Sequence, residues 1–173
     1  MKTLQTNIKK MKTNLFSKLS LALVLFFVGS MTVKAQTQLT HKSGLKITVP
    51  ATWKHEVDGD DILTMVTPDE NVAMTFVNIP ASAFDAALAE AEKQIKSVVK
   101  NFKEKGEGKE TKINGMDAFM GEGTGQVEGQ DVEVGLLFVK NGNNVLFVFA
   151  IGVKGKTDAH DNAIGQVLNS IKK

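Results

Sequence analysis

Acidic side chains gather in one short stretch of the sequence, and carboxylate oxygens are ligands that calcium prefers. A loop that folded them around one ion would make a binding site. The spaced ligand series with a central glycine that defines an EF-hand loop is absent, however. We therefore interpret the stretch as a solvated turn with ordinary turn chemistry, and we expect no metal site. The residues concerned are Glu56, Asp58, Asp60 and Asp61.

Glycines at every second position of the segment GEGTGQVEG, residues 121–129, could cradle a phosphate group. A phosphate-binding loop must lead straight into a helix N-terminus, where free N–H groups meet the anion. Here the glycines share one face of an extended segment, and a second strand follows. We predict that they let a helix lie close, or let the strand curl before a hairpin at Glu128-Gly129. A shallow groove over them is the alternative.

Histidines are the other residues that could bind a metal or transfer protons. His41, His55 and His160 are scattered, and no two have the i, i+4 spacing of a helical zinc pair. The chain has no cysteine, and it has no G-x-S-x-G elbow or serine–lysine pair. Because catalysis needs a convergent set of titrating groups, we expect no catalytic residue, no cofactor and no enzyme.

Trp53 is the only tryptophan, and it follows Pro50 by three positions. It could be a lid over the core or an exposed anchor for a ligand. The average burial of large aromatic side chains favours the lid. If the chain contacts another protein, the surface around this tryptophan is our first choice and the glycine-bearing strand our second. That surface comprises Trp53, His55, Glu56, Asp58, Asp60 and Asp61.

The first 35 residues have the pattern of a Sec signal peptide. Lysines precede an apolar run at 19–28 that is too short to span a bilayer, and Val33 and Ala35 fit an A-x-A cleavage site. We predict a signal peptide over 1–35, a loose polar lead-in segment over 36–43 and one globular domain over 44–173. Without a cysteine at the cleavage site, the product is a periplasmic or extracellular protein rather than a lipoprotein.

Removal of this leader changes the sign of the net charge. The leader holds six lysines and no acidic residue, which leaves 15 lysines against 19 acidic side chains, a net of −4. Every basic residue is lysine, so the guanidinium forks that suit phosphate and base edges are absent. We therefore expect neither a nucleic-acid partner nor membrane insertion of the mature chain.

The first half of the domain shows three short strands followed by a helix. Three runs that read as strands, 44–49, 62–67 and 72–79, each end immediately before a proline. The acidic turns DGDD at 58–61 and PDEN at 68–71 precede the second and third runs. After Pro80 the period changes to that of a helix, with Ser82 and Asp85 as a near-capping box. The helical stripe, which reaches about Lys103, consists of Phe84, Leu88, Ala91, Ile95, Val98 and Phe102.

The second half shows four strands and a second helix. Asn114-Gly115 and Asn141-Gly142 are hairpin turns between strands at 110–113, 118–126, 132–140 and 144–153. The last two strands are apolar at nearly every position, so both faces of the sheet must be covered there. Thr157 or Asp158 caps the second helix, which supplies the missing layer. The fold class is therefore α+β, an α/β/α sandwich with a mainly antiparallel central sheet and two covering helices.

The segment GLKITVPATW, residues 44–53, resembles the opening of the PsbP-like superfamily, which includes bacterial DcrB-type exported proteins and the eukaryotic Ran-binding Mog proteins. Pro68-Asp69, INGMDA at 113–118 and VLNSIKK at 167–173 extend the resemblance over most of the domain. The resemblance implies an α/β/α sandwich around an antiparallel sheet. It carries no metal ligands onto this chain.

Two functions remain open at this point. The first is a non-catalytic, exported binding or accessory protein that contacts another envelope or extracellular protein. The second is a carrier of a small ligand or a divalent cation that uses the acidic turns. The two differ in whether the acidic stretch around Asp58 binds an ion or lies beside a protein partner.

Overall fold

The computed structural model describes residues 36–59 and 62–173, which lie in one compact unit. The predicted signal peptide, Asp60 and Asp61 fall outside the described residues. No helix within the described part has the length and apolarity that a membrane span requires.

An eight-stranded antiparallel sheet forms the middle of this unit, as the α+β prediction requires. Seven strands follow the order β3-β4-β5-β10-β9-β8-β6, and β7 pairs with β8 beside β6. The strands are β3 (Lys54–Asp58), β4 (Ile62–Val66), β5 (Val72–Pro80), β6 (Lys100–Glu104), β7 (Lys109–Ile113), β8 (Met116–Val127), β9 (Gln130–Asn141) and β10 (Asn144–Val153).

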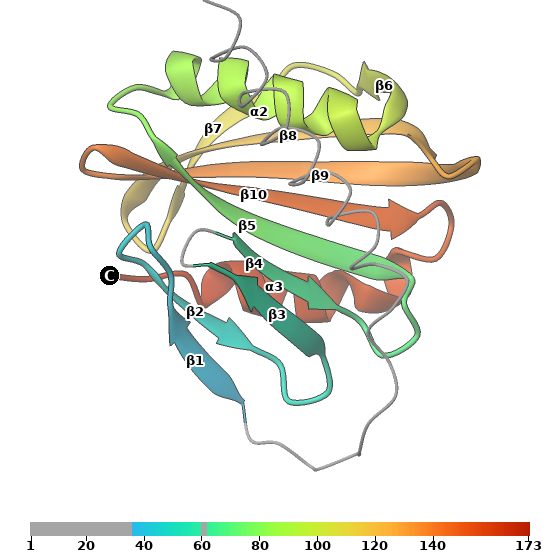
Figure 1. The fold of residues 1–173 in the computed structure, drawn as a ribbon, viewed down its shortest axis with the longest axis horizontal. Coiled ribbons are helices and arrows are strands. Elements are labelled where there is room, and N and C mark those ends of the chain that lie inside the picture. The colour runs from blue at the N-terminus through green and yellow to red at the C-terminus, as the bar shows by residue number, and fades with distance from the viewer. Residues whose placement is uncertain (1–35, 60–61) are drawn as a thin grey trace, which may run out of the picture. The chain divides into compact units, whose positions relative to one another are not determined.

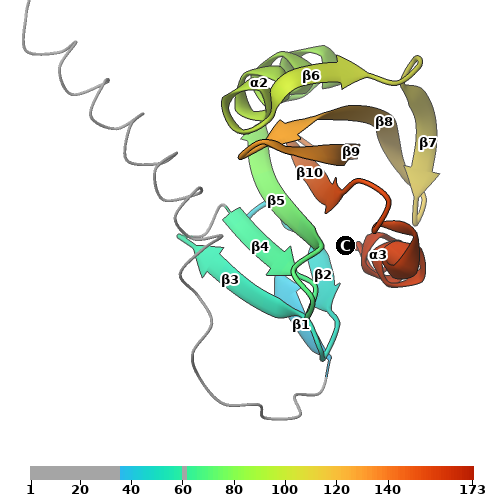
Figure 2. The ribbon, with the colours of Figure 1, turned by 90° about the vertical axis from the view of Figure 1, so that its right-hand side faces the viewer.

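Strand β10 shows why both faces of the sheet are covered. Successive side chains of a strand point to opposite faces, so Phe147 belongs to one apolar cluster and its neighbours Leu146 and Val148 to another. All three are at most 2% exposed. Helix α2 (Phe84–Val98) lies on the Phe147 side, and helix α3 (Asp161–Asn169) lies on the other side (Figures 1 and 2). The predicted sandwich is confirmed.

A separate hairpin completes the layer that contains α3. Strand β1 (Thr37–Thr40) pairs with β2 (Lys46–Val49), and together they form a two-stranded sheet (Figure 1). Ile47 and Leu45 are fully buried in the same cluster as Val167 of α3. The prediction of a loose segment before residue 44 is therefore wrong, because β2 supplies backbone partners for β1.

Helix α2 follows the predicted stripe, but its two ends differ from the prediction. Ala83 is the N-cap and makes no side-chain hydrogen bond, so the near-capping box at Ser82 is wrong. The helix ends at Val98, and Phe102 lies on β6 rather than on the helical stripe. β-branched Val98 and Val99 favour extended backbone, and Asn101 has a φ of 53°.

The C-terminal helix begins later than predicted. A 3₁₀ turn, η1 (Asp158–His160), precedes α3. The predicted cap, Thr157, makes no side-chain capping bond and instead donates its hydroxyl hydrogen bond to Glu133, with 2.5 Å between Oγ1 and Oε2. Val167 of α3 and Ile171 just beyond it are buried in the core cluster on that side of the sheet.

Candidate functional site

The predicted contact surface lies on and beside strand β3, which the sequence analysis did not recognise as a strand. β3 is the terminal strand of the main sheet and pairs with β4, with Val57 opposite Leu63 and His55 opposite Met65. Trp53 precedes β3 and is only 6% exposed within the α3-side core cluster. Its burial favours the lid interpretation and removes its side chain from the exposed surface.

The pleat of β3 gives its two faces different chemistry. His55 and Val57 share the face of Met65 and Leu63, because directly paired residues point to the same side. Glu56 and Asp58 point to the opposite face. Asp58 is exposed, Glu56 is partly buried, and Val57 is 50% exposed. Val57 and Met120 are the exposed large hydrophobic side chains of the described residues.

A pocket of about 320 Å³ opens beside Val57. Its walls come from the end of β1 and the residues after it, and from the β3–β4 pair. Leu63 at 1% exposure is the most deeply buried part of the lining. The complete lining is Leu39, Thr40, His41, Lys42, Val57 and Leu63.

Polar contacts fix the β1–β2 turn that forms one wall of this pocket. His41 is 6% exposed, and its Nδ1 lies 3.1 Å from the hydroxyl oxygen of Ser43. Asn141, the last residue of β9, donates a hydrogen bond of 2.8 Å from Nδ2 to the Ser43 carbonyl. The turn is thus tied to the main sheet, so the wall is set by directed bonds as well as by apolar packing.

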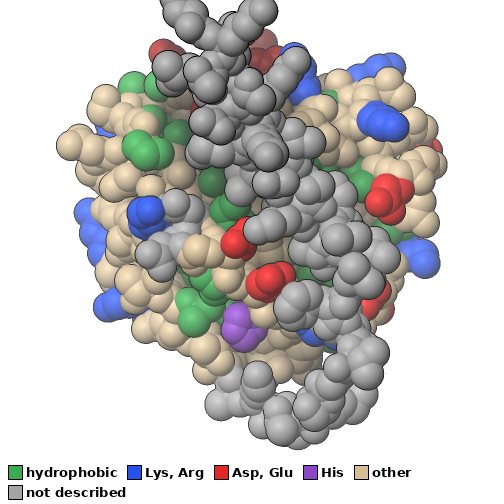
Figure 3. All heavy atoms as spheres, in the orientation of Figure 1, with side chains coloured by type: hydrophobic (Ala, Val, Ile, Leu, Met, Phe, Trp, Pro, Cys, Tyr) green, Lys and Arg blue, Asp and Glu red, His purple; other side chains and the backbone are tan. Residues whose placement is uncertain are grey.

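The acidic side chains near β3 do not form a metal centre within the described residues. No group of three or more His, Asp or Glu side chains among residues 36–59 and 62–173 has a geometry that could hold a metal ion. The visible surface of Figure 3 carries lysines mainly along its margins, with acidic and apolar side chains between them.

The glycine-bearing strand, our second choice for a contact surface, is occupied by the chain itself. A Cβ on Gly125 would lie 2.9 Å from the Lys100 carbonyl oxygen, and one on Gly123 would lie 2.8 Å from that of Lys103. Both positions lie inside β8, and a strand follows. The glycines thus lie in a strand and not at a helix N-terminus, but the segment that they admit is Val99 and strand β6 rather than the predicted helix.

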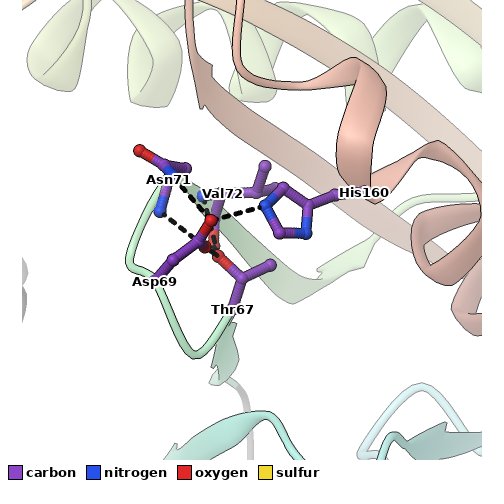
Figure 4. A network of polar contacts seen from close by, with 5 residues as sticks. All are labelled: Thr67, Asp69, Asn71, Val72 and His160. Atoms are coloured by element: carbon purple, nitrogen blue, oxygen red, sulfur yellow. Dashed lines mark hydrogen bonds and ion pairs between the residues drawn. The ribbon is translucent and has the colours of Figure 1, made fainter.

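A second polar cluster joins the β4–β5 turn to the C-terminal helix (Figure 4). Asp69 accepts hydrogen bonds from the Thr67 hydroxyl at 2.7 Å and from Asn71, and its Oδ2 lies 2.9 Å from Nε2 of His160. The Thr67 hydroxyl bond is the largest cause that holds the pKa of Asp69 well below its usual range, and the Asn71 and His160 bonds add to it. The cluster positions α3 against the turn.

Comparison with protein-family models finds no match, and comparison with curated proteins finds none. Solved structures do match. PsbP (CyanoP) of Synechocystis sp. PCC 6803 aligns with a TM-score of 0.56 at 10% identity, over 85% of this chain and 97% of that one. The chain has the PsbP-like fold.

Two further structures share the PsbP-like fold. LpqN of Mycobacterium tuberculosis has a TM-score of 0.53 at 18% identity, over 80% of this chain and 91% of LpqN. Mog1p of Saccharomyces cerevisiae has a TM-score of 0.53 at 9% identity, over 79% and 94%. The chain also spans about half, 47%, of a Bacteroides thetaiotaomicron structure that it matches. At these identities the likeness shows the fold alone.

The contact surface predicted from the sequence and the pocket share strand β3, but sequence reasoning missed the residues that line the pocket. Val57 was overlooked between the acidic residues, although it is the one aliphatic side chain in the sequence KHEVD. Leu39 and His41 were assigned to a loose segment. Asp69 and His160 were noted separately, and nothing in their spacing of 91 positions could have paired them.

Proposed function

We propose that this chain is a non-catalytic, exported accessory protein that works by contacting another protein of the envelope or the extracellular space. The observation that carries the proposal is the exposure of Val57 on a terminal strand, beside acidic side chains and a pocket whose lining is half apolar. An edge strand that leaves apolar side chains exposed is a template on which another chain can pair.

The structural neighbours support this type of function without assigning a partner. Mog1p is described as a Ran-binding protein, and LpqN is described as involved in cell envelope biogenesis. Binding of a protein partner and work in the envelope are therefore both found on the PsbP-like fold. Export of this chain rests on its leader sequence, whose lysines, apolar run and small residues have the order of a Sec signal.

Export is tested by the mass and N-terminal sequence of the protein recovered from the envelope or the medium. We expect a product that begins at Gln36. Recovery of the unprocessed chain in the cytoplasm alone would contradict this part of the proposal.

Protein contact is tested by crosslinking in cells followed by purification on a C-terminal tag. We expect one specific crosslinked partner with the wild type and loss of that partner with Val57→Asp. Met120→Asp is the matched control, because Met120 is 41% exposed and lies on β8, across β9, β10 and β5 from the β3–β4 pair. Equal yields of the partner with both variants would remove β3 from the contact. Repeated failure to recover a partner with the wild type would contradict the proposed function.

A further inference from the structure

The two ends of the main sheet carry opposite charges. At the β8 end, β6 has the sequence KNFKE and β7 has KETKI, so lysines dominate both strands. At the β3 end, the sequence KHEVD supplies Glu56 and Asp58. Lys54 of β3 is already paired with Glu70, with 3.1 Å between Nζ and Oε1. Charged side chains on an edge strand discourage pairing with an unmatched strand, so a strand that pairs with β3 must place opposite charge beside Glu56 and Asp58.

The outer side of β3 has the backbone groups that another strand would need. β3 pairs through all five residues with β4 on one side, and among residues 36–59 and 62–173 no strand pairs with its other side. In an antiparallel pair, alternate residues direct their N–H and C=O groups away from the partner. A further extended segment would bind these groups through backbone hydrogen bonds. Its side chains would contact those of β3 on both faces of the sheet, and these contacts would set the specificity.

We propose that β3 accepts an extended segment of the partner protein as an added strand, and that this segment alternates basic and apolar side chains. The proposal rests on the proposed function and names the class of partner surface. On one face, lysine or arginine side chains of the segment lie opposite Glu56 and Asp58, where opposite charges stabilise cross-strand pairs. On the other face, an apolar side chain packs on Val57 and enters the pocket against Leu39 and Leu63.

The alternation of side chains along a strand allows the added segment to use the pocket and the acidic face at the same time. Alternate side chains of a strand project to the same face, so a segment that places one apolar side chain beside Val57 places its neighbours on the acidic face. The pocket volume of about 320 Å³ is near the lower end of small-ligand sites. It suits a protruding side chain rather than a large cofactor.

The test uses two synthetic peptides, one of alternating lysine and valine and one of alternating glutamate and valine, titrated into the purified protein. We expect the lysine peptide to bind and the glutamate peptide to bind about tenfold more weakly or not at all. Val57→Asp is the informative variant, because it adds a negative charge to the surface. Non-specific attraction of the lysine peptide would increase in this variant, whereas strand addition with an apolar contact would weaken by about tenfold.

Two further variants test whether binding depends on the charge of β3 and on its location. The double change Glu56→Lys and Asp58→Lys should reverse the preference in favour of the glutamate peptide. Met120→Asp should leave the binding of both peptides unchanged. Hydrogen exchange provides the readout that is specific to strand addition: amides of residues 54–58 should exchange more slowly with the lysine peptide bound, and those of β6 and β7 should not change.

Several results would overturn this inference. They are no binding of the lysine peptide to the wild type, binding that Val57→Asp does not weaken, or unchanged exchange across β3. Concentration-dependent self-association of the wild type that Val57→Asp abolishes would assign β3 to a second copy instead. If cells yield a crosslinked partner that the charge-reversed variant still contacts, the accessory function stands and this mode of contact fails. If the peptides behave as expected but no cellular partner is found, strand addition to β3 stands and the accessory function fails.

Discussion

The two helices cover the same sheet by different physical means. Helix α2 has 15 residues and buries a continuous stripe that includes Ala91 and Ile95 against aromatic side chains of the sheet. Ion pairs such as that of Lys93 with Glu90 run along the helix itself. Helix α3 has nine residues, of which only Val167 is fully buried. It is held by hydrogen bonds at its two ends.

The difference follows from the area that each helix can bury. Apolar burial contributes roughly 25 cal/mol per Å², so a long stripe stabilises α2 without directed contacts. The short α3 needs them. Asn114 donates to the carbonyls of Asn169 and Ile171 at 2.8 and 2.7 Å, the Ser170 hydroxyl accepts the Thr48 N–H at 2.8 Å, and His160 contacts Asp69. One face is thus covered by a long amphipathic helix, and the other by a short helix, which hydrogen bonds hold at its ends, together with the β1–β2 hairpin.

The largest effect should come from the aromatic cluster beneath α2. Phe147 is fully buried and stacks on Phe138 with 4.8 Å between the ring centroids. Phe147→Ala should lower the free energy of unfolding by about 3–5 kcal/mol, measured by urea denaturation with circular dichroism. Phe147→Leu is the control and should lose clearly less. A loss below about 1 kcal/mol for the alanine variant would contradict the view that packing alone holds this layer.

A smaller loss is expected where the end of α2 passes over β8. Gly125→Ala places a Cβ 2.9 Å from the Lys100 carbonyl oxygen, so the backbone must move, and we expect a loss of about 1–3 kcal/mol. Gly121→Ala is the matched control on the same strand, since its Cβ would meet Leu136 at an ordinary 3.8 Å. Equal melting curves for both variants would mean that β6 and β8 separate easily.

The α2 side was the more predictable of the two from sequence. The apolar run of β10 required two layers, and the period of α2 located one of them. The α3 side depends on contacts between distant residues, such as Asp69 with His160, which no local pattern encodes. Strand β3 was missed because KHEVD does not alternate apolar and polar residues. A strand at the end of a sheet buries few side chains, so it can form without that alternation. The end of α2 was misplaced because Phe102 continues the helical spacing by coincidence.

Loss of the Asn114 hydrogen bonds at the end of α3 should lower the free energy of unfolding by less than either change on the α2 side. Asn114 has a φ of 47°, in the left-handed region, and its side chain makes both bonds to the end of α3. Asn114→Ala should cost about 1–2 kcal/mol, from the lost bonds and from the strained backbone. Asn114→Gly removes the bonds but relieves the strain, so it should cost about 1 kcal/mol. Full stability of the glycine variant in urea would show that the two bonds contribute nothing to the docking of α3.

The smallest effect should be a pH dependence at the other end of α3. Hydrogen bonds, chiefly from Thr67, hold the pKa of Asp69 below its ordinary value, so the ionised carboxylate stabilises the folded state. This contribution is fully present above the unfolded value of about 3.9 and is lost as the pH falls through the lower folded value. Asp69→Asn should therefore lower the urea midpoint at neutral pH by an amount that stays constant down to about pH 5 and shrinks below about pH 4.

Asp117→Asn is the control for this pH dependence, because it removes an exposed carboxylate from a surface pair with Lys112. Such pairs contribute little to stability, so its urea midpoint should follow the wild type at every pH. If Asp69→Asn also followed the wild type, the cluster in Figure 4 would orient the β4–β5 turn without stabilising α3. The packing of Val167 and Ile171, together with Asn114 and Ser170, would then hold the helix, and α3 would depend on directed bonds at its C-terminal end only.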